Sequence, residues 1–310
     1  MLTHPFQSHI ERKLLTTMTQ NDRFLVYGAS GSQGGAVAQL LIQNGCEVRT
    51  ITRNEETAKT LKEQNIEAFI GDLSDVEHLH AAHEGVSKVF LNLPVEFNPE
   101  KIRQYTKNAI DAAIQANVKL IVVNTGTYVP DPITHSKGIE LKREVIHELH
   151  QSGLPYIIVE PIVYLENFLI PGILNNGVLA YPVPADKPIS WISLNDAAQF
   201  HYYALTHSEL AGSIIPAPGL EALTGAQLAE QFSAVLGEKI SFMSLPFDHF
   251  EAAIQPLLGS ETAAGLKGLY QWIDGHTDLL PRYEELDDNI KANLKLTKIS
   301  DWIHQTIIKQ

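Results

Sequence analysis

The sequence predicts an α/β fold, a doubly wound parallel β-sheet followed by a smaller α+β lobe. Short apolar runs alternate with helical patterns from Arg23 to about Glu160, the order of elements in a parallel sheet covered on both faces. A glycine-rich segment directly follows the first apolar run. Several expected helices end at Gly or Asn, which favour a left-handed C-terminal cap; these residues are Gly45, Gly85, Asn117 and Gly153.

The first half of the chain contains the expected strands of this sheet. They are short apolar runs at residues 24–28, 47–52, 67–72, 88–93, 119–125 and 155–161. The expected helices lie between them, at residues 37–45, 56–64, 76–85, 100–118 and 140–153. In the last two, apolar residues recur at spacings of three and four, as on one face of a helix. This alternation predicts right-handed crossovers and therefore parallel strands.

Prolines interrupt the chain after Pro161, and the expected elements become shorter there. Two helices (195–206 and 224–237), a strand (239–245) and a closing helix (296–307) are still recognisable. Thr224 is a favourable N-cap for the second of these helices. We therefore expect three parts, which are an N-terminal extension outside the fold (1–20), a sheet domain (21–160) and a smaller C-terminal lobe (161–310).

Composition and charge exclude several classes of protein. The 310 residues are 44% apolar and 19% charged, as in ordinary globular proteins. The formal net charge of −13 repels phosphate backbones, so no direct nucleic-acid partner is expected. Cys46 is the only cysteine, which excludes an intrachain disulfide and fits a reducing compartment. With no apolar run near the roughly 18 residues of a membrane span, we expect a cytoplasmic protein that avoids membranes. Met1 and Met18 both remain open as the start.

The glycines after the first strand indicate a phosphate-binding turn. Gly28, Gly31 and Gly34 have the spacing G-x-x-G-x-x-G between a strand and a helix. In a βαβ unit such glycines allow a tight turn, let a pyrophosphate approach the backbone, and let the helix pack on the strand. The alternative is a glycine-rich turn that binds nothing. The candidate cofactor-binding residues here are Gly28, Ser30, Gly31, Ser32, Gln33 and Gly34.

The end of the second strand selects between the two nicotinamide dinucleotides. Folds that bind NAD place an acid there to accept from the ribose hydroxyl, but this strand ends in Arg53. A guanidinium pairs with a 2′-phosphate, so NADP(H) is the expected cofactor. The alternative is a solvated arginine at a strand end.

Two further strand ends lie on the same edge of the sheet. Asp72 and Leu73 follow the third strand, and Asn92, Leu93 and Pro94 follow the fourth. Ligands of such folds bind outside the carboxyl ends of the strands, so these residues are expected to contact the adenine, ribose and nicotinamide. Asp72 is equally explained as the N-cap of the next helix.

Together these segments resemble the NmrA-like family of atypical short-chain dehydrogenase/reductases. The resemblance is carried by GASGSQGG (28–35), ITRN (51–54), GDLSD (71–75), SGLPYIIVEPIVYLENF (152–168) and PISWISLNDAAQF (188–200). It implies a Rossmann fold with a small C-terminal substrate lobe. It also implies either NADPH-dependent reduction of a small carbonyl or quinone, or cofactor sensing without turnover. The second alternative would act through a protein partner.

The resemblance does not extend to the usual catalytic pair of the wider superfamily. Enzymes of the wider superfamily use a Tyr-x-x-x-Lys pair to protonate the substrate, but the residue four places before Lys142 is Gly138. Some relatives without the tyrosine are thought to rely on a lysine in this helix. We therefore expect Lys142 and Thr125 as catalytic residues, against the alternatives of a solvated lysine and a loop-capping threonine. The candidate substrate-binding residues are Tyr128, Tyr164 and Asn167.

The histidines do not indicate a metal site. His78, His80 and His83 have spacings that do not place three ligands on one helix face. His147 and His150 lack a third ligand nearby in the sequence. No G-x-S-x-G turn is present, so a hydrolase triad has no nucleophile elbow. No metal is therefore expected.

Overall fold

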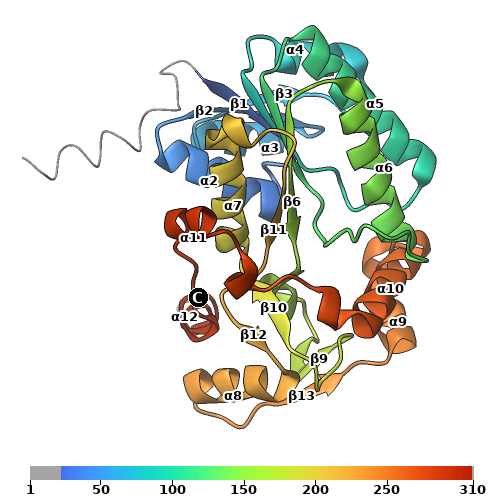
Figure 1. Cartoon of the computed structure of the whole chain (residues 1–310), viewed down its shortest axis with the longest axis vertical. Coiled ribbons are helices and arrows are strands. Elements are labelled where there is room, and N and C mark those ends of the chain that lie inside the picture. Colours follow the sequence, from blue (N-terminus) through green and yellow to red (C-terminus); the bar gives the residue numbers. More distant parts are fainter. Residues whose placement is uncertain (1–21, 309–310) are drawn as a thin grey trace, which may run out of the picture.

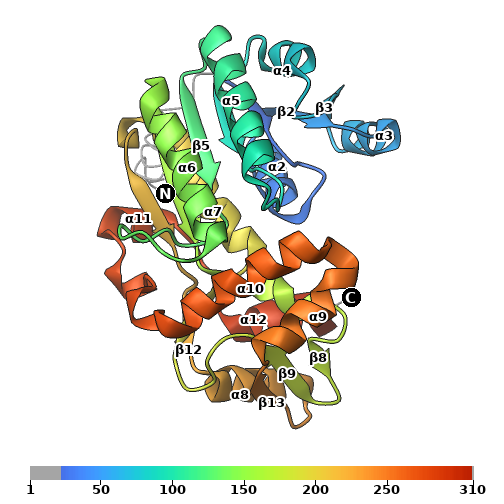
Figure 2. The same cartoon turned by 90° about the vertical axis from the view of Figure 1, so that its right-hand side faces the viewer.

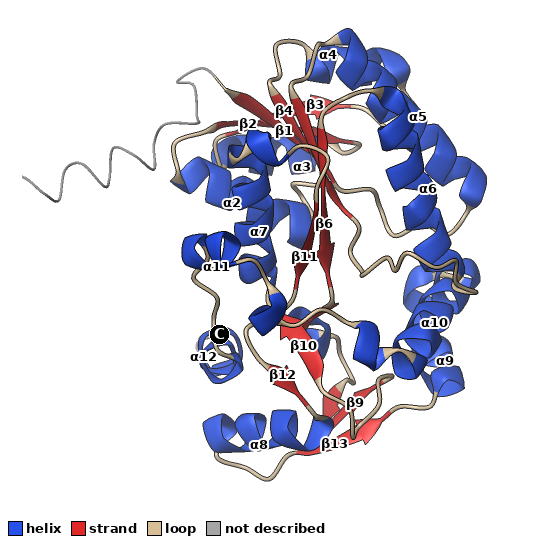
Figure 3. Cartoon of the chain, viewed as in Figure 1, coloured by secondary structure: helices blue, strands red, loops and turns tan. Residues whose placement is uncertain are grey.

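The computed structural model describes residues 22–308, and the N-terminal extension expected at residues 1–20 lies outside this range. Its centre is a seven-stranded sheet in the order β11-β6-β5-β4-β1-β2-β3 (Figures 1 and 3). All its neighbouring strands are parallel. The strands are β1 (Arg23–Val26), β2 (Glu47–Thr52), β3 (Ile66–Ile70), β4 (Lys88–Leu91), β5 (Leu120–Asn124), β6 (Tyr156–Pro161) and β11 (Ile214–Ala217). The doubly wound fold is confirmed, because strands 3-2-1-4-5-6 have the Rossmann order.

Helices cover both faces of the sheet (Figure 1). One face carries α2 (Ser32–Gln43), α3 (Glu55–Glu63) and α7 (Leu194–Thr206); the other carries α4 (Val76–His83), α5 (Pro99–Gln115) and α6 (Lys137–Ser152). Each face has its own apolar core, represented by Val37 and Phe200 on the first and by Leu79 and Val145 on the second. The residues expected to terminate helices all have a positive φ, namely Gly45 (77°), Gly85 (70°), Asn117 (55°) and Gly153 (73°).

The remaining chain forms a smaller region beyond the carboxyl ends of the strands (Figure 2). It contains two small sheets, β12-β10-β7 and β13-β9-β8. Their strands are β7 (Val163–Tyr164), β8 (Leu174–Asn175), β9 (Val178–Tyr181), β10 (Ile189–Ile192), β12 (Ala222–Leu223) and β13 (Ser241–Ser244). The helices are α8 (Gly225–Leu236), α9 (Phe247–Leu258), α10 (Ser260–Gly275), α11 (Asp288–Asn293) and α12 (Ile299–Ile303). Thr224 forms the expected N-cap of α8, in a capping box with Gln227.

The chain does not divide in space at residue 160. β11 pairs with β6 in the large sheet, although it follows Pro161 in sequence. α7 also packs on the large sheet, because Phe200 and Ala204 belong to the core that it shares with α2. A description that follows the packing therefore assigns α7 and β11 to the sheet domain. Most of the other residues after Pro161 form the smaller region, although Ile290 of α11 also packs against the core that α2 and α7 share.

Candidate active site

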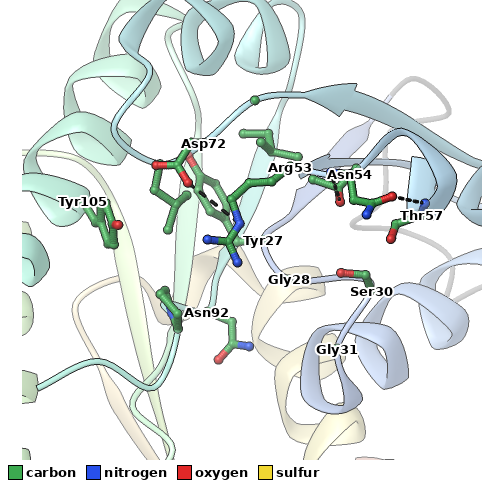
Figure 4. Close-up of a pocket in the computed structure, with 15 residues that line it drawn as sticks. Tyr27, Gly28, Ser30, Gly31, Arg53, Asn54, Thr57, Asp72, Asn92 and Tyr105 are labelled. Atoms are coloured by element: carbon green, nitrogen blue, oxygen red, sulfur yellow. Dashed lines mark hydrogen bonds and ion pairs between the residues drawn. The ribbon is translucent and has the colours of Figure 1, made fainter. Parts of the chain in front are cut away.

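A cavity of ≈ 460 Å³ opens at the carboxyl ends of the strands, between the β1–α2 turn and the ends of β2, β3 and β4 (Figure 4). The sequence-predicted residues that line it are Gly28, Ser30, Gly31, Arg53, Asp72, Leu73, Asn92 and Pro94. The structure thus brings together residues from four separate strand ends. Sequence reasoning missed other lining residues, among them Asn54, Thr57 and Tyr105. Asn54 directly follows Arg53, and Thr57 lies in the first turn of the next helix; this closeness to Arg53 in the sequence was a signal for both.

The glycines at the base of this cavity have different structural tasks. Gly28 has a φ of 72°, which is unfavourable for any residue with a side chain. A Cβ on Gly34 would lie 2.4 Å from the Gly28 carbonyl oxygen, so Gly34 allows α2 to pack against the strand end. A Cβ on Gly31 would meet nothing nearer than 3.4 Å. Gly31 therefore leaves open space above the turn.

The N-terminus of α2 is suited to an anion. Its N-cap is Gly31, which offers no side-chain cap, and the first turn carries no acidic residue. The first amides of a helix have no partner within the helix, and its dipole favours negative charge there. The open space at Gly31 and these amides fit the pyrophosphate of a dinucleotide.

Arg53 and Asp72 both line the cavity and lie next to each other, beyond the ends of the neighbouring strands β2 and β3 (Figure 4). Arg53 Nε lies 3.9 Å from Asp72 Oδ2, and the arginine side chain is 82% exposed. The Asp72 carboxylate accepts from the Ser74 amide at 2.9 Å and from the Ser74 hydroxyl at 2.7 Å. These bonds, with the Arg53 charge, lower the pKa of Asp72. The alternative role of Asp72 as a helix N-cap is wrong, because Asp75 caps α4 by accepting from the His78 amide.

A second cavity of ≈ 100 Å³ lies beside the first, and Asn92 lines both. The predicted residues Gln33, Leu93, Thr125 and Lys142 line this second cavity. Its other walls come from Phe97 before α5 and from Leu266 and Leu269 of α10. Figures 1 and 2 show α10 lying against α6, so the smaller region closes this part of the site.

A polar network joins the strand ends between the two cavities. Asn124 Nδ2 donates to Gln33 Oε1 at 2.7 Å and to Asn92 Oδ1 at 3.1 Å. Asn124 Oδ1 accepts from the Gly126 amide at 3.0 Å. Asn124 is buried at the end of β5, and it fixes the glycine turn relative to β4. Sequence reasoning missed this residue, although its place at a strand end was a signal.

Lys142 lines the second cavity, and its pKa is shifted from the ordinary lysine value towards neutral pH. Burial lowers the pKa of Lys142 to about 8. No hydrogen bond or ion pair of its ammonium group is found among residues 22–308. Lys137, earlier on α6, instead pairs with Glu261 at 3.0 Å. Lys142 is therefore a cation that the surrounding protein leaves available.

Thr125 is buried at the edge of the same cavity, but its hydroxyl is already engaged. Oγ1 lies 2.7 Å from the Thr127 carbonyl oxygen and 3.1 Å from that of Val159. Its proton is thus shared with the backbone, which leaves only acceptor capacity for a substrate. This geometry favours the loop-positioning alternative for Thr125 over a role as proton donor.

The three predicted substrate residues do not line the second cavity. Tyr164 is buried in the core under α7, and burial raises its pKa. Asn167 donates to the Tyr181 hydroxyl at 2.7 Å within the smaller region. Tyr128 packs near Trp272 and lines a separate cavity of ≈ 390 Å³ with Glu160. Tyr164 ends β7, and Asn167 lies in the 3-10 helix Leu165–Leu169 that continues into the smaller region. The sequence motif did not reveal this change of direction. Ser32, also predicted, begins α2 and lines neither of the first two cavities.

Within residues 22–308, no group of three His, Cys, Asp or Glu side chains has a geometry that could hold a metal ion. In the same range, no helix is both long and apolar enough to span a bilayer.

The fold and the first cavity define a Rossmann-type protein with a dinucleotide site. The family model of the NmrA-like family matches residues 20–303, so the chain belongs to the NmrA-like family and this expectation is confirmed. An NAD(P)H azoreductase from Xenophilus azovorans is 28% identical over 268 residues, covering 83% of this chain and 91% of the relative. A (4-alkanoyl-5-oxo-2,5-dihydrofuran-3-yl)methyl phosphate reductase from Streptomyces griseus is 30% identical over 234 residues, covering 74% and 79%.

Solved structures confirm the fold. An NADPH-dependent quinone oxidoreductase from Escherichia coli, complexed with NADPH, superposes with a TM-score of 0.73 at 23% identity, covering 91% of this chain and 99% of that one. A triphenylmethane reductase from Citrobacter sp., complexed with NADP(H), gives a TM-score of 0.74 at 21% identity, covering 92% and 100%.

Proposed function

We propose that this protein is an NADPH-dependent oxidoreductase that reduces a small quinone or carbonyl compound. One observation carries the proposal: a cavity of ≈ 460 Å³ lined by the glycine turn and Arg53 meets, at Asn92, a smaller cavity that contains an available cation, Lys142. An electron donor and a small acceptor can therefore approach each other at Asn92. We propose a cytoplasmic location as well, as the composition suggests.

The known relatives support an enzyme. The similar proteins from Xenophilus azovorans and Streptomyces griseus are reductases, and the quinone oxidoreductase and the triphenylmethane reductase have the same fold. The regulatory alternative, in which NADP(H) occupancy changes the affinity for a protein partner, has no comparable support. The glycine turn and Arg53 would serve both functions, whereas an available lysine in a second cavity favours an enzyme.

The residues of the first cavity would hold NADPH, which supplies the hydride when it is bound. The amides at the start of α2 would bind the pyrophosphate, and Arg53 would pair with the 2′-phosphate. Asp72 would accept from the adenine amino group. Asn92, fixed by Asn124, would lie at the boundary with the acceptor cavity.

Lys142 would stabilise the negative charge that develops on the acceptor oxygen. Its ammonium lies in a partly apolar cavity, where a fixed charge acts more strongly than it does in water. This arrangement suits a quinone, because the anion of the reduced product is already stabilised and needs less help from an acid. A tyrosine in place of Gly138 would collide with Phe97, since even a Cβ there would lie 2.8 Å from its ring. The chain has therefore filled the usual position of the proton-donating tyrosine with the Phe97 ring.

Steady-state oxidation of NADPH tests the proposal. We expect turnover with at least one member of a panel of quinones and aldehydes, and slower turnover with NADH. NADPH binding measured by calorimetry serves as the control. If NADPH binds and no acceptor in a broad panel is reduced, the regulatory alternative replaces the enzyme.

A further inference from the structure

The Phe97 ring lies between two glycines that belong to different helices. A Cβ on Gly138 of α6 would lie 2.8 Å from Cε1 of Phe97, and a Cβ on Gly265 of α10 would lie 2.1 Å from its Cδ1. Both distances are too short for a real carbon–carbon contact, so the ring fits only because neither position has a side chain. Phe97 is 6% exposed there. Two helices far apart in sequence thus form a slot with the thickness of an aromatic ring.

The ring occupies space that an acceptor needs. Phe97 lines the second cavity together with Leu141, Lys142 and Leu266. This cavity measures ≈ 100 Å³, whereas an apolar cavity that binds one benzene molecule measures about 150 Å³. In the present arrangement a single aromatic ring would fit only tightly beside Lys142, and two fused rings exceed the space. An acceptor with two fused rings therefore requires a side chain to move.

The polar contacts of residues 95–97 connect this segment to the start of α5 and not to the two helices that form the slot. The Glu96 carboxylate accepts from the Phe97 and Asn98 amides at 3.0 and 2.9 Å, and it pairs with Lys101 at 3.1 Å. Val95 beside it is 63% exposed. Among the described residues, no hydrogen bond joins residues 95–97 to α6 or α10. The ring is held in the slot by apolar contacts alone, so its departure breaks no hydrogen bond.

We propose that Phe97 is the specificity-determining residue of the acceptor cavity. An aromatic acceptor displaces the Phe97 ring from between Gly138 and Gly265, and its own flat ring takes that place beside Lys142. The inference rests on the proposed function. The apparent affinity for a ring then includes the cost of displacing Phe97, because only the fraction of molecules with an open slot can bind. Acceptors with two fused rings are affected most, since they need the whole slot.

Binding of a ring that cannot be reduced tests this without turnover. Calorimetry with naphthalene, on protein saturated with NADP⁺, should give a dissociation constant at least about tenfold lower for Phe97→Ala than for the unmodified protein, because the cost of displacing the ring is gone. Phe97→Leu, which keeps an apolar side chain and protects the fold, should give an intermediate value. Phe242→Ala is the matched control, because its ring also lies against a glycine (a Cβ on Gly225 would be 2.3 Å away) but does not line the cavity. It should leave naphthalene binding unchanged.

The outcomes separate this inference from the proposed function. Equal or weaker naphthalene binding by both folded Phe97 variants overturns the inference, since the ring would then be a fixed wall or a contact surface. Menadione reduction by NADPH is assayed in parallel. If the Phe97 variants reduce menadione at the same rate as the unmodified protein, the proposed oxidoreductase function is kept and the inference about Phe97 is rejected. Tighter naphthalene binding without any menadione reduction supports the role of Phe97 in the cavity and counts against the quinone reductase.

Discussion

Gly34 packs so closely against Gly28 that a Cβ on Gly34 would lie 2.4 Å from the Gly28 carbonyl oxygen, whereas a Cβ on Gly31 would lie 3.4 Å from the same atom. The two glycines should therefore respond differently to substitution. Gly31→Val should abolish NADPH binding and leave the melting temperature nearly unchanged, because the new side chain fills only the space above the turn. Gly34→Ala should lower the stability by about 1–3 kcal/mol, because the methyl group overlaps the backbone.

Calorimetric titration with NADPH and thermal melts of both variants check this pair. The comparison is internal, since each variant serves as the control of the other. If Gly31→Val still binds NADPH as tightly as the unmodified protein, the pyrophosphate does not lie over this turn.

Arg53 should determine the preference for NADPH over NADH. A charge-assisted pair with the 2′-phosphate is worth about 1.5–3 kcal/mol, which corresponds to at least about tenfold in affinity. Arg53→Asp should remove or reverse the preference, measured as the ratio of the two dissociation constants. Lys59→Ala is the control, because Lys59 is an exposed cation on the nearby α3 that pairs with Glu56 and does not line the cavity. Equal affinities of the unmodified protein for the two cofactors would contradict this assignment.

Lys142 should make turnover depend on pH. Since burial lowers the pKa of Lys142 to about 8, the ammonium is present below this pH and is lost above it. The kcat for quinone reduction should therefore fall as the pH rises through about 8. Lys142→Arg, which stays charged, should flatten this profile. Lys142→Ala should lower kcat about a hundredfold and leave NADPH affinity almost unchanged.

The control for Lys142 is Lys137→Ala on the same helix, where the lysine pairs with Glu261 outside the cavity. It should retain the unmodified pH profile. Turnover that is the same in Lys142→Ala and in the unmodified protein would assign the catalytic role to another residue.

Glu160 should make the folded state less stable as the pH rises. Burial raises the pKa of Glu160 to about 8, with a smaller contribution from Asp131 against the opposing effects of the Val129 amide and Arg143. The folded protein then holds a proton that the unfolded chain releases near its ordinary pKa. The stability gained from this proton is complete below about pH 4 and is lost as the pH rises to about 8, at up to about 1.4 kcal/mol per pH unit.

Glu160→Gln keeps the shape of the side chain and cannot titrate. Urea unfolding of both proteins at several pH values between 5 and 9 should show their stability difference growing in favour of the variant as pH rises. A difference that does not change with pH would mean that Glu160 is already charged in the folded protein.

Local patterns predicted the sheet and most of the cofactor site. Gly28, Arg53 and Asp72 each lie within two residues of the end of a strand, so the positions of the strands predicted that they share one edge of the sheet. The acceptor cavity was not predictable in this way, because Leu266 and Leu269 reach it only through the packing of α10 on α6. For the same reason, α7 was expected as a helix but not as a layer of the large sheet. β11 was missed since it is short and contains Pro216.

The pairing of β11 with β6 has a consequence for the synthesis of the chain. Residues 23–161 contain every other strand of the large sheet, yet the edge of β6 stays open until Ile214–Ala217 has left the ribosome. An unpaired strand edge is a template for association with other chains. Nascent chains that stall after β6 has been synthesised and before β11 has emerged should therefore be the most prone to aggregate. The finished protein should unfold in a single cooperative transition, because neither region completes its core without segments from the other.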